Sequence, residues 1–177
     1  MRTSIKIMAM MLSMIAVAFG TTSCGEEDND PLDVKSVNAE YSLELSQLWF
    51  EFYDIDVTYY DQAGKENTVR VTEKWSYGFS VKPKDAPRNY KFTVVATPKK
   101  VHPEINGSQY VLSENIVGEF YGIRYDGSTY KELWSDLSPY TVTEADVLTF
   151  SSAQFKDYLD GGSRKLMDFT KTFDGNY

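Results

Sequence analysis

The stretch YDIDVTYYDQAGKENTVRV, residues 53–71, decides the fold. Every second residue from Tyr53 to Tyr59 is apolar or aromatic, and this period of two indicates a strand with one face in a core. Residues 61–65 have the composition of a turn, in which Gly64 can adopt a positive φ. A second alternating run ends at Val71. The stretch therefore predicts an antiparallel β-hairpin.

The same alternation recurs along much of the chain. It predicts further strands at 39–45, 75–81, 90–96 and 167–173. Residues 110–112 and 117–125 read as two strands, or as one long strand with a kink at 113–115. The alternation is interrupted at Leu48-Trp49-Phe50, which predicts a short turn of helix or a strand crossover there. Short strands separated by turn signals favour an all-β class, an antiparallel β-sandwich.

The last third of the chain also contains helical patterns. Tyr130 and Trp134 are four residues apart, which predicts a helical turn within 130–137, and 144–148 could begin a short helix. Ser151 and Gln154 have the spacing of a capping box before a helix that ends at the glycine pair 161–162. The fold expectation therefore includes one or two short helices near the C-terminus.

The N-terminus has the three parts of a secretory signal. Arg2 and Lys6 form a basic flank, residues 7–19 are almost all apolar, and 20–23 are small. A transmembrane anchor is the alternative, but the apolar run is shorter than the roughly 20 residues that a spanning helix needs. We therefore expect a signal peptide at 1–23.

Cys24 is the only cysteine in the chain, so it has no internal disulfide partner. The sequence Thr21-Thr22-Ser23-Cys24 resembles a bacterial lipobox, in which the cysteine becomes the acylated N-terminus. The alternative is a free thiol in a secreted protein. An acidic run from Glu26 to Asp30 follows; it is either a solvated spacer or an export tag, and we interpret 24–33 as a lipidated acidic tether.

The remaining residues, 34–177, are expected to form a single β-sandwich domain. The full chain has a net charge of −8, and removing the signal would remove Arg2 and Lys6, so the mature chain would be more acidic still. A surface this negative repels a phosphate backbone, so we expect no nucleic-acid partner.

The lipobox, the acidic run, the 53–71 hairpin and the late helix before a terminal strand together resemble the Ig-like β-sandwich surface lipoproteins of Bacteroidota. This resemblance implies a lipid anchor in the outer membrane, exposure on the cell surface and an Ig-like sandwich. It carries no catalytic motif, so it implies a location and a fold more than an activity.

Few residues can support metal or nucleophilic chemistry. His102 is the single histidine and lies in a proline-bounded loop, without an identifiable nucleophile partner. Zinc needs three or four nitrogen or sulfur ligands, which this chain cannot supply once Cys24 is acylated. Acidic residues could serve calcium or glycoside hydrolysis, but their spacing matches no calcium loop and does not reveal a carboxylate pair. We expect no metal, no cofactor and no enzyme activity.

Aromatic residues are abundant, with 13 tyrosines and three tryptophans. Those on strand faces are expected in the core: Tyr41, Tyr53, Tyr59, Trp75, Tyr77 and Tyr90. Those at strand breaks or of opposite parity form a candidate binding surface: Trp49, Tyr60, Tyr130 and Trp134. Such rings can stack on sugars or anchor a protein interface, or they can simply cap the ends of the sandwich.

The leading expectation is a non-enzymatic outer-membrane lipoprotein that serves binding or assembly, with a ligand that the sequence does not identify. The alternatives are a carbohydrate-binding lipoprotein and a hydrolase. An exposed coplanar aromatic platform would favour glycan binding, and a cleft with facing carboxylates would favour hydrolysis. A flat apolar patch or an unpaired edge strand would favour a protein partner.

Overall fold

The computed structural model describes residues 30–130 and 141–172. Its elements in chain order are β1 (Val34–Leu45), α1 (Gln47–Phe52), β2 (Tyr53–Tyr60), β3 (Glu66–Val71), β4 (Trp75–Val81), the 3-10 turn η1 (Pro83–Asp85), β5 (Asn89–Pro98), β6 (Tyr110–Arg124), β7 (Thr129–Tyr130), β8 (Thr141–Phe150), α2 (Ser152–Asp160) and β9 (Arg164–Thr172). The predicted signal peptide and Cys24 lie outside the described residues. No helix within the described ranges is long and apolar enough to cross a bilayer.

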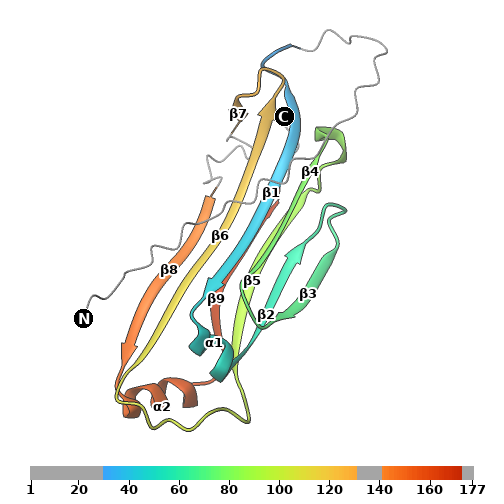
Figure 1. Ribbon diagram of the computed structural model, residues 1–177. Coiled ribbons are helices and arrows are strands. Elements are labelled where there is room, and N and C mark those ends of the chain that lie inside the picture. Colours follow the sequence, from blue (N-terminus) through green and yellow to red (C-terminus); the bar gives the residue numbers. More distant parts are fainter. Residues whose placement is uncertain (1–29, 131–140, 173–177) are drawn as a thin grey trace, which may run out of the picture.

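The strands form two antiparallel sheets that pack face to face (Figure 1). The first sheet has the order β4-β1-β6, and both β7 and β8 pair with the far side of β6. The second sheet has the order β3-β2-β5-β9. This arrangement confirms the predicted antiparallel β-sandwich. Among the described strands, β4, β7 and β8 are the edges of the first sheet and β3 and β9 those of the second.

The core lies between the sheets and is mainly aromatic and aliphatic. Tyr41 of β1 is its centre: its ring lies 5.1 Å from that of Phe92 on β5 and 5.6 Å from that of Phe120 on β6. Tyr53 and Tyr90 are buried as well, as the alternation predicts. Tilted and edge-on ring pairs of this kind add to the free energy gained from burial alone.

One end of the sandwich is closed by the two helices (Figure 1). Phe155 of α2 packs edge-on to Phe52 of α1 at 4.8 Å and stacks on Tyr110 of β6 at 4.4 Å. The predicted capping box is present, with the backbone N–H of Ser151 donating to Gln154 Oε1 at 2.9 Å. The capping box fixes where α2 begins, and the buried ring of Phe155 fixes which face points inward.

The predicted hairpin is confirmed in β2 and β3. In its turn, Asp61 Oδ1 accepts hydrogen bonds from the N–H groups of Ala63 and Lys65. Gly64 has φ +72°, a conformation that costs other residues more than glycine. The local turn chemistry therefore sets the register of the two strands.

Two local expectations change in the structure. The short helix expected at 144–148 is wrong, because this segment belongs to β8, which pairs continuously with β6 from Thr141 to Phe150. Unpaired backbone groups along the long strand β6 favour a strand there more than the local propensity of residues 144–146 favours a helix. The two readings of 110–125 resolve into one strand, β6. Tyr130 lies in β7, and the rest of the expected turn at 131–137 lies outside the described residues.

Candidate functional site

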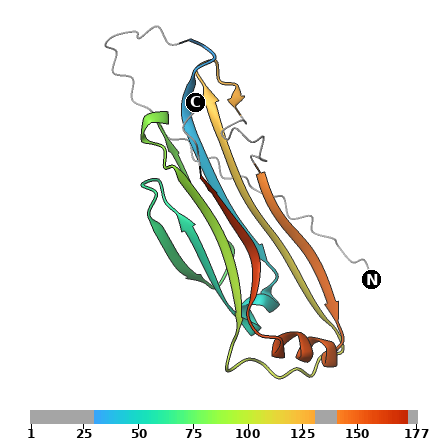
Figure 2. The same ribbon diagram turned by 180° about the vertical axis from the view of Figure 1, so that it is seen from behind.

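Two sides of the sandwich remain open, and they differ in chemistry. On one side, β3 of the second sheet crosses to β4 of the first through residues 72–74. On the opposite side, β8 forms the margin of the first sheet, outside the strands of the second sheet (Figure 2). The first side is lined by aromatic rings and the second by carboxylates.

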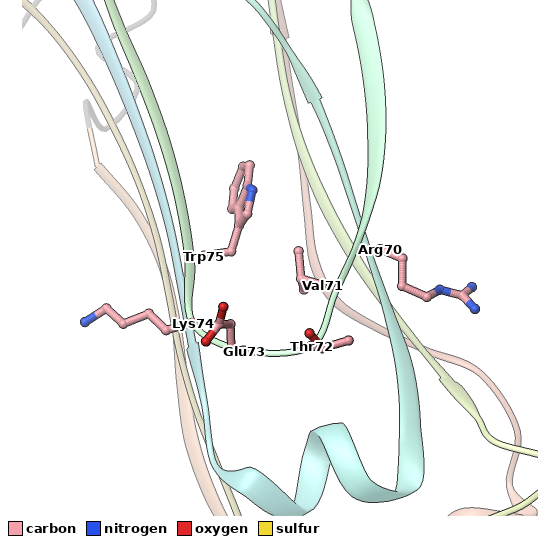
Figure 3. A pocket seen from close by; sticks show the side chains of 6 residues that line it. All are labelled: Arg70, Val71, Thr72, Glu73, Lys74 and Trp75. Atoms are coloured by element: carbon pink, nitrogen blue, oxygen red, sulfur yellow. The ribbon is translucent and has the colours of Figure 1, made fainter.

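The crossover from β3 to β4 lines a shallow pocket of about 220 Å³, formed by residues 70–75. Figure 3 shows Val71 and Trp75 directed between the two strands, whereas Arg70 and Lys74 point away to either side. The Arg70 guanidinium pairs with Asp56 at 2.8 Å and with Asp54 at 3.1 Å. The pocket is therefore apolar at its base, with Arg70 engaged on the surface of its own sheet.

Trp75, which lines this pocket, belongs to a cluster of three half-buried rings that we call the aromatic opening: Tyr59 of β2 with Trp75 and Tyr77 of β4. The ring of Tyr59 lies 5.1 Å from that of Trp75 and 4.6 Å from that of Tyr77. The planes are inclined by 51° and 42°, so the rings do not form one flat platform. The sequence places all three in the core, but the edge position of β4 leaves them partly exposed.

The aromatic surface predicted from the sequence is not assembled. Trp49 is 0% exposed, so its assignment to a binding surface is wrong; its ring packs against Tyr53 in the core at 5.0 Å. Tyr60 lies at the end of β2 in the second sheet, and Tyr130 lies on β7 in the first sheet, under the guanidinium of Arg124 at 4.9 Å. Trp134 lies outside the described residues.

The second open side is a nearly uncovered strand. Residues 143–147 of β8 are all exposed, and Val147 retains 65% of its accessible surface. On the outer face β8 presents threonine, alanine and valine, and neither lysine, arginine nor proline occurs anywhere in the strand. Among the described strands β8 pairs with β6 alone. Its other edge therefore presents backbone N–H and C=O groups without a strand partner in this part of the chain.

On the inner face of β8, Glu144 and Asp146 lie beside Glu114 of β6. Asp146 is the direct cross-strand partner of Glu114, and Glu144 is the partner of Ile116. Burial, with the negative charges of Asp146 and Glu144 added, raises the pKa of Glu114 from 4.5 to about 7. We call Glu114, Glu144, Asp146 and the free margin of β8 the acidic edge.

Within the described ranges these three carboxylates have no ion-pair partner. The guanidinium of Arg164, on β9, instead lies over the ring of Tyr158 at 3.5 Å and donates to that residue's carbonyl oxygen. No group of three or more metal-ligating side chains is placed to hold an ion in this part of the structure. Asp146 Oδ1 accepts a hydrogen bond from the backbone N–H of Val147 at 2.7 Å, but no cation among the described residues pairs with the acidic edge.

The sequence contains a signal for the acidic edge, but it is easily misread. Glu144 and Asp146 alternate within a run rich in threonine and valine, a pattern that fits a strand with two carboxylates on one face. Glu114 could not be added from sequence, because it lies 32 positions from Asp146 and meets it only through strand pairing.

No protein-family model matches the chain, and no curated protein or solved structure matches it either.

Proposed function

We propose that the chain is a non-enzymatic lipoprotein, held in the outer membrane through acylated Cys24 and exposed at the cell surface, whose sandwich binds a protein partner by strand pairing along β8. One observation carries the binding part of this proposal: the margin of β8 is exposed over residues 143–147 and has no strand beside it among the described residues.

An unpaired strand edge can bind a protein partner by strand addition. Its N–H and C=O groups can form a ladder with an extended chain, and side chains at alternate positions then set specificity. Proteins usually protect such edges with lysine, proline or a covering element. The edges of the second sheet carry cations, with Arg70 on β3 and Lys165 and Lys171 on β9, whereas β8 has neither lysine, arginine nor proline and carries only the inward-facing carboxylates of Glu144 and Asp146.

The location rests on the sequence around Cys24. Two or more acyl chains hold a protein stably at a membrane, and the acidic run 26–30 would separate the sandwich from it. Radiolabelled palmitate should enter the full chain and fail to enter Cys24→Ala. Protease treatment of intact cells should remove the sandwich domain; survival of the whole domain would contradict surface exposure.

Site-specific crosslinking tests the binding surface. A photoreactive amino acid at Val147 should form a defined adduct in cells, with the partner's contact mapping to an extended segment. The matched control is Val101, which is 87% exposed but lies in a loop. Equal crosslinking at both positions, or none at Val147, would remove the support for an interface at β8.

Glycan binding is the second candidate, and the aromatic opening favours it. Half-exposed tyrosine and tryptophan rings can stack on sugar faces. The rings are inclined by 42° to 51° and already contact one another, so they would offer a sugar their outer faces and edges and not one flat platform. A glycan array with the full chain and with Trp75→Ala tests this candidate; binding that is equal for both would exclude the opening as the site.

A further inference from the structure

We infer that the strand that pairs with β8 is an extended basic segment of another protein, with lysine or arginine at alternate positions opposite Glu144 and Asp146. This inference rests on the proposed strand pairing and specifies its chemistry. It comes from three features of the acidic edge: the periodicity of its charges, the lack of a cation beside them in the described part of the chain, and the composition of the outer face.

The periodicity follows from strand geometry. Glu144 and Asp146 are two residues apart, so both project from the inner face of β8, while Ala145 between them projects outward. A strand added beside β8 would place two of its own residues, also two apart, directly opposite these carboxylates. The partner must therefore carry its matching charges with a period of two.

The electrostatics select a basic segment. Glu114 lies next to Asp146 across the β6–β8 ladder, so three carboxylates share one side of the edge. Burial is the main cause of the elevated pKa of Glu114, about 7, and the negative charges of Asp146 and Glu144 raise it further. A lysine or arginine opposite Glu144 and Asp146 would relieve this repulsion at close range, where solvent screening is incomplete.

The same carboxylates argue against a second copy of this chain as the occupant. In an antiparallel β8–β8 pair centred on Ala145, Glu144 of each copy would face Asp146 of the other, and like charges directly opposite are destabilising. Inward-pointing charge is one of the devices that prevent edges from pairing with themselves. The acidic edge thus disfavours self-association while it attracts a basic strand.

The outer face of β8 indicates which residue types the partner strand carries between its basic positions. Thr143, Ala145 and Val147 are exposed and uncharged, which suits threonine or valine on the facing strand. The occupant is therefore a segment in which lysine or arginine alternates with β-branched residues. This pattern also gives the segment an intrinsic preference for the extended conformation.

A synthetic peptide as long as β8, in which lysine alternates with valine or threonine, is the probe. It is titrated into the full chain in detergent at low salt, and amide hydrogen exchange is measured in parallel. We expect binding that slows exchange in residues 141–150 and leaves β9 unchanged. A peptide of the same composition with its lysines in one block is the control for non-specific attraction to an acidic protein, and it should bind at least about tenfold more weakly.

Charge reversal tests the basic specificity. The double variant Glu144→Lys/Asp146→Lys should weaken binding of the alternating peptide by about tenfold or more, and should bind a glutamate-containing counterpart better than the natural chain does. The matched control is Asp85→Lys/Glu104→Lys, which changes the net charge equally at exposed positions away from β8. If both double variants weaken binding equally, the attraction is general and the inference fails.

Two N-methylated peptides separate this inference from the proposed strand pairing. Methylating alternate amides removes the donors on one edge of the peptide, so one of the two possible sets should abolish binding and the other should leave it intact. If neither set matters, backbone pairing at β8 is wrong and the proposed function loses its site. If one set matters but charge reversal does not, strand pairing stands and the basic partner is wrong.

Discussion

The aromatic opening and the acidic edge both lie where the sheets of the sandwich end. They differ in whether their side chains find partners within the molecule. At the aromatic opening, the rings of Tyr59, Trp75 and Tyr77 pack on one another, and the nearby cation of Arg70 is paired with Asp54 and Asp56. At the acidic edge, three carboxylates gather beside an uncovered strand, without a cation among the described residues. The aromatic opening pairs its nearby cation within its own sheet, whereas the acidic edge keeps its carboxylates without a described cation.

The difference teaches that exposure alone does not mark a site. The partly exposed aromatic rings of the opening mainly pack on one another and complete this end of the core. At the acidic edge the exposed backbone groups of β8 are open to a pairing strand, and the neighbouring like charges raise the local electrostatic energy.

Replacing a tryptophan in the core should cost far more than replacing one at the aromatic opening. Trp49→Ala should lower the free energy of unfolding by about 3–5 kcal/mol, because the ring is fully buried and its removal leaves a cavity. Trp75→Ala should lower it by roughly half as much or less, since solvent already reaches part of that ring. Urea unfolding of both variants measures the difference, and equal losses would show that the opening is part of the core.

Stability should depend on pH in opposite directions at the two sides. The raised pKa of Glu114 means that the folded state favours the protonated form, so its contribution is present below about pH 4.5 and is lost as pH rises to about 7. We expect a loss on the order of 1 kcal/mol, reduced by solvent screening of this half-exposed group. Denaturant unfolding of the natural chain and of Glu114→Gln across this range should show the loss only in the former.

Near the aromatic opening, stability should change with pH in the opposite direction. The Arg70 guanidinium beside Asp56 lowers the pKa of that carboxyl below 3.8, so its stabilising contribution is present above this value and is lost as pH falls through the lowered pKa. Unfolding measured below pH 4 should therefore show a decline in stability that Asp56→Asn removes. An unchanged decline in that variant would mean that the ion pair does not act in solution.

Neutralising one carboxylate on each side should have effects of opposite sign at pH 8. Glu144→Gln should raise the free energy of unfolding by a few tenths of a kcal/mol, because it relieves repulsion at the acidic edge. Asp56→Asn should lower it, because it removes the partner of Arg70. Thermal unfolding at low salt measures both variants, and a loss of stability in Glu144→Gln would show that its charge is compensated.

The variant with the smallest expected effect on stability tests binding without disturbing the fold. Val147→Lys should change the free energy of unfolding by less than about 0.5 kcal/mol, since the side chain is 65% exposed. It should nevertheless weaken strand addition at β8, because lysine is a common protector of open edges. Thr129→Lys, on the exposed face of the short strand β7, is the matched control and should leave peptide binding unchanged.

Much of the fold could be predicted from the sequence, because its signals are local. The alternation from Tyr53 to Tyr59, the turn around Gly64 and the capping box of Ser151 with Gln154 each involve residues close together in the chain. The helix expected at 144–148 failed because the pairing partner of that segment lies about 30 positions earlier, on β6. Local propensity there is weak, and the unpaired edge of β6 decided the outcome.

The sequence by itself determined the strand periodicity, the position of α2 and an acidic chain poor in histidine and with a single cysteine. Only the tertiary structure decided which aromatic rings are covered and which carboxylates meet. A strand's own residues specify its two faces, but whether a face is buried depends on the sheet opposite it. For this reason Trp49 became part of the core, Trp75 remained half exposed, and Glu114 came to lie against Asp146.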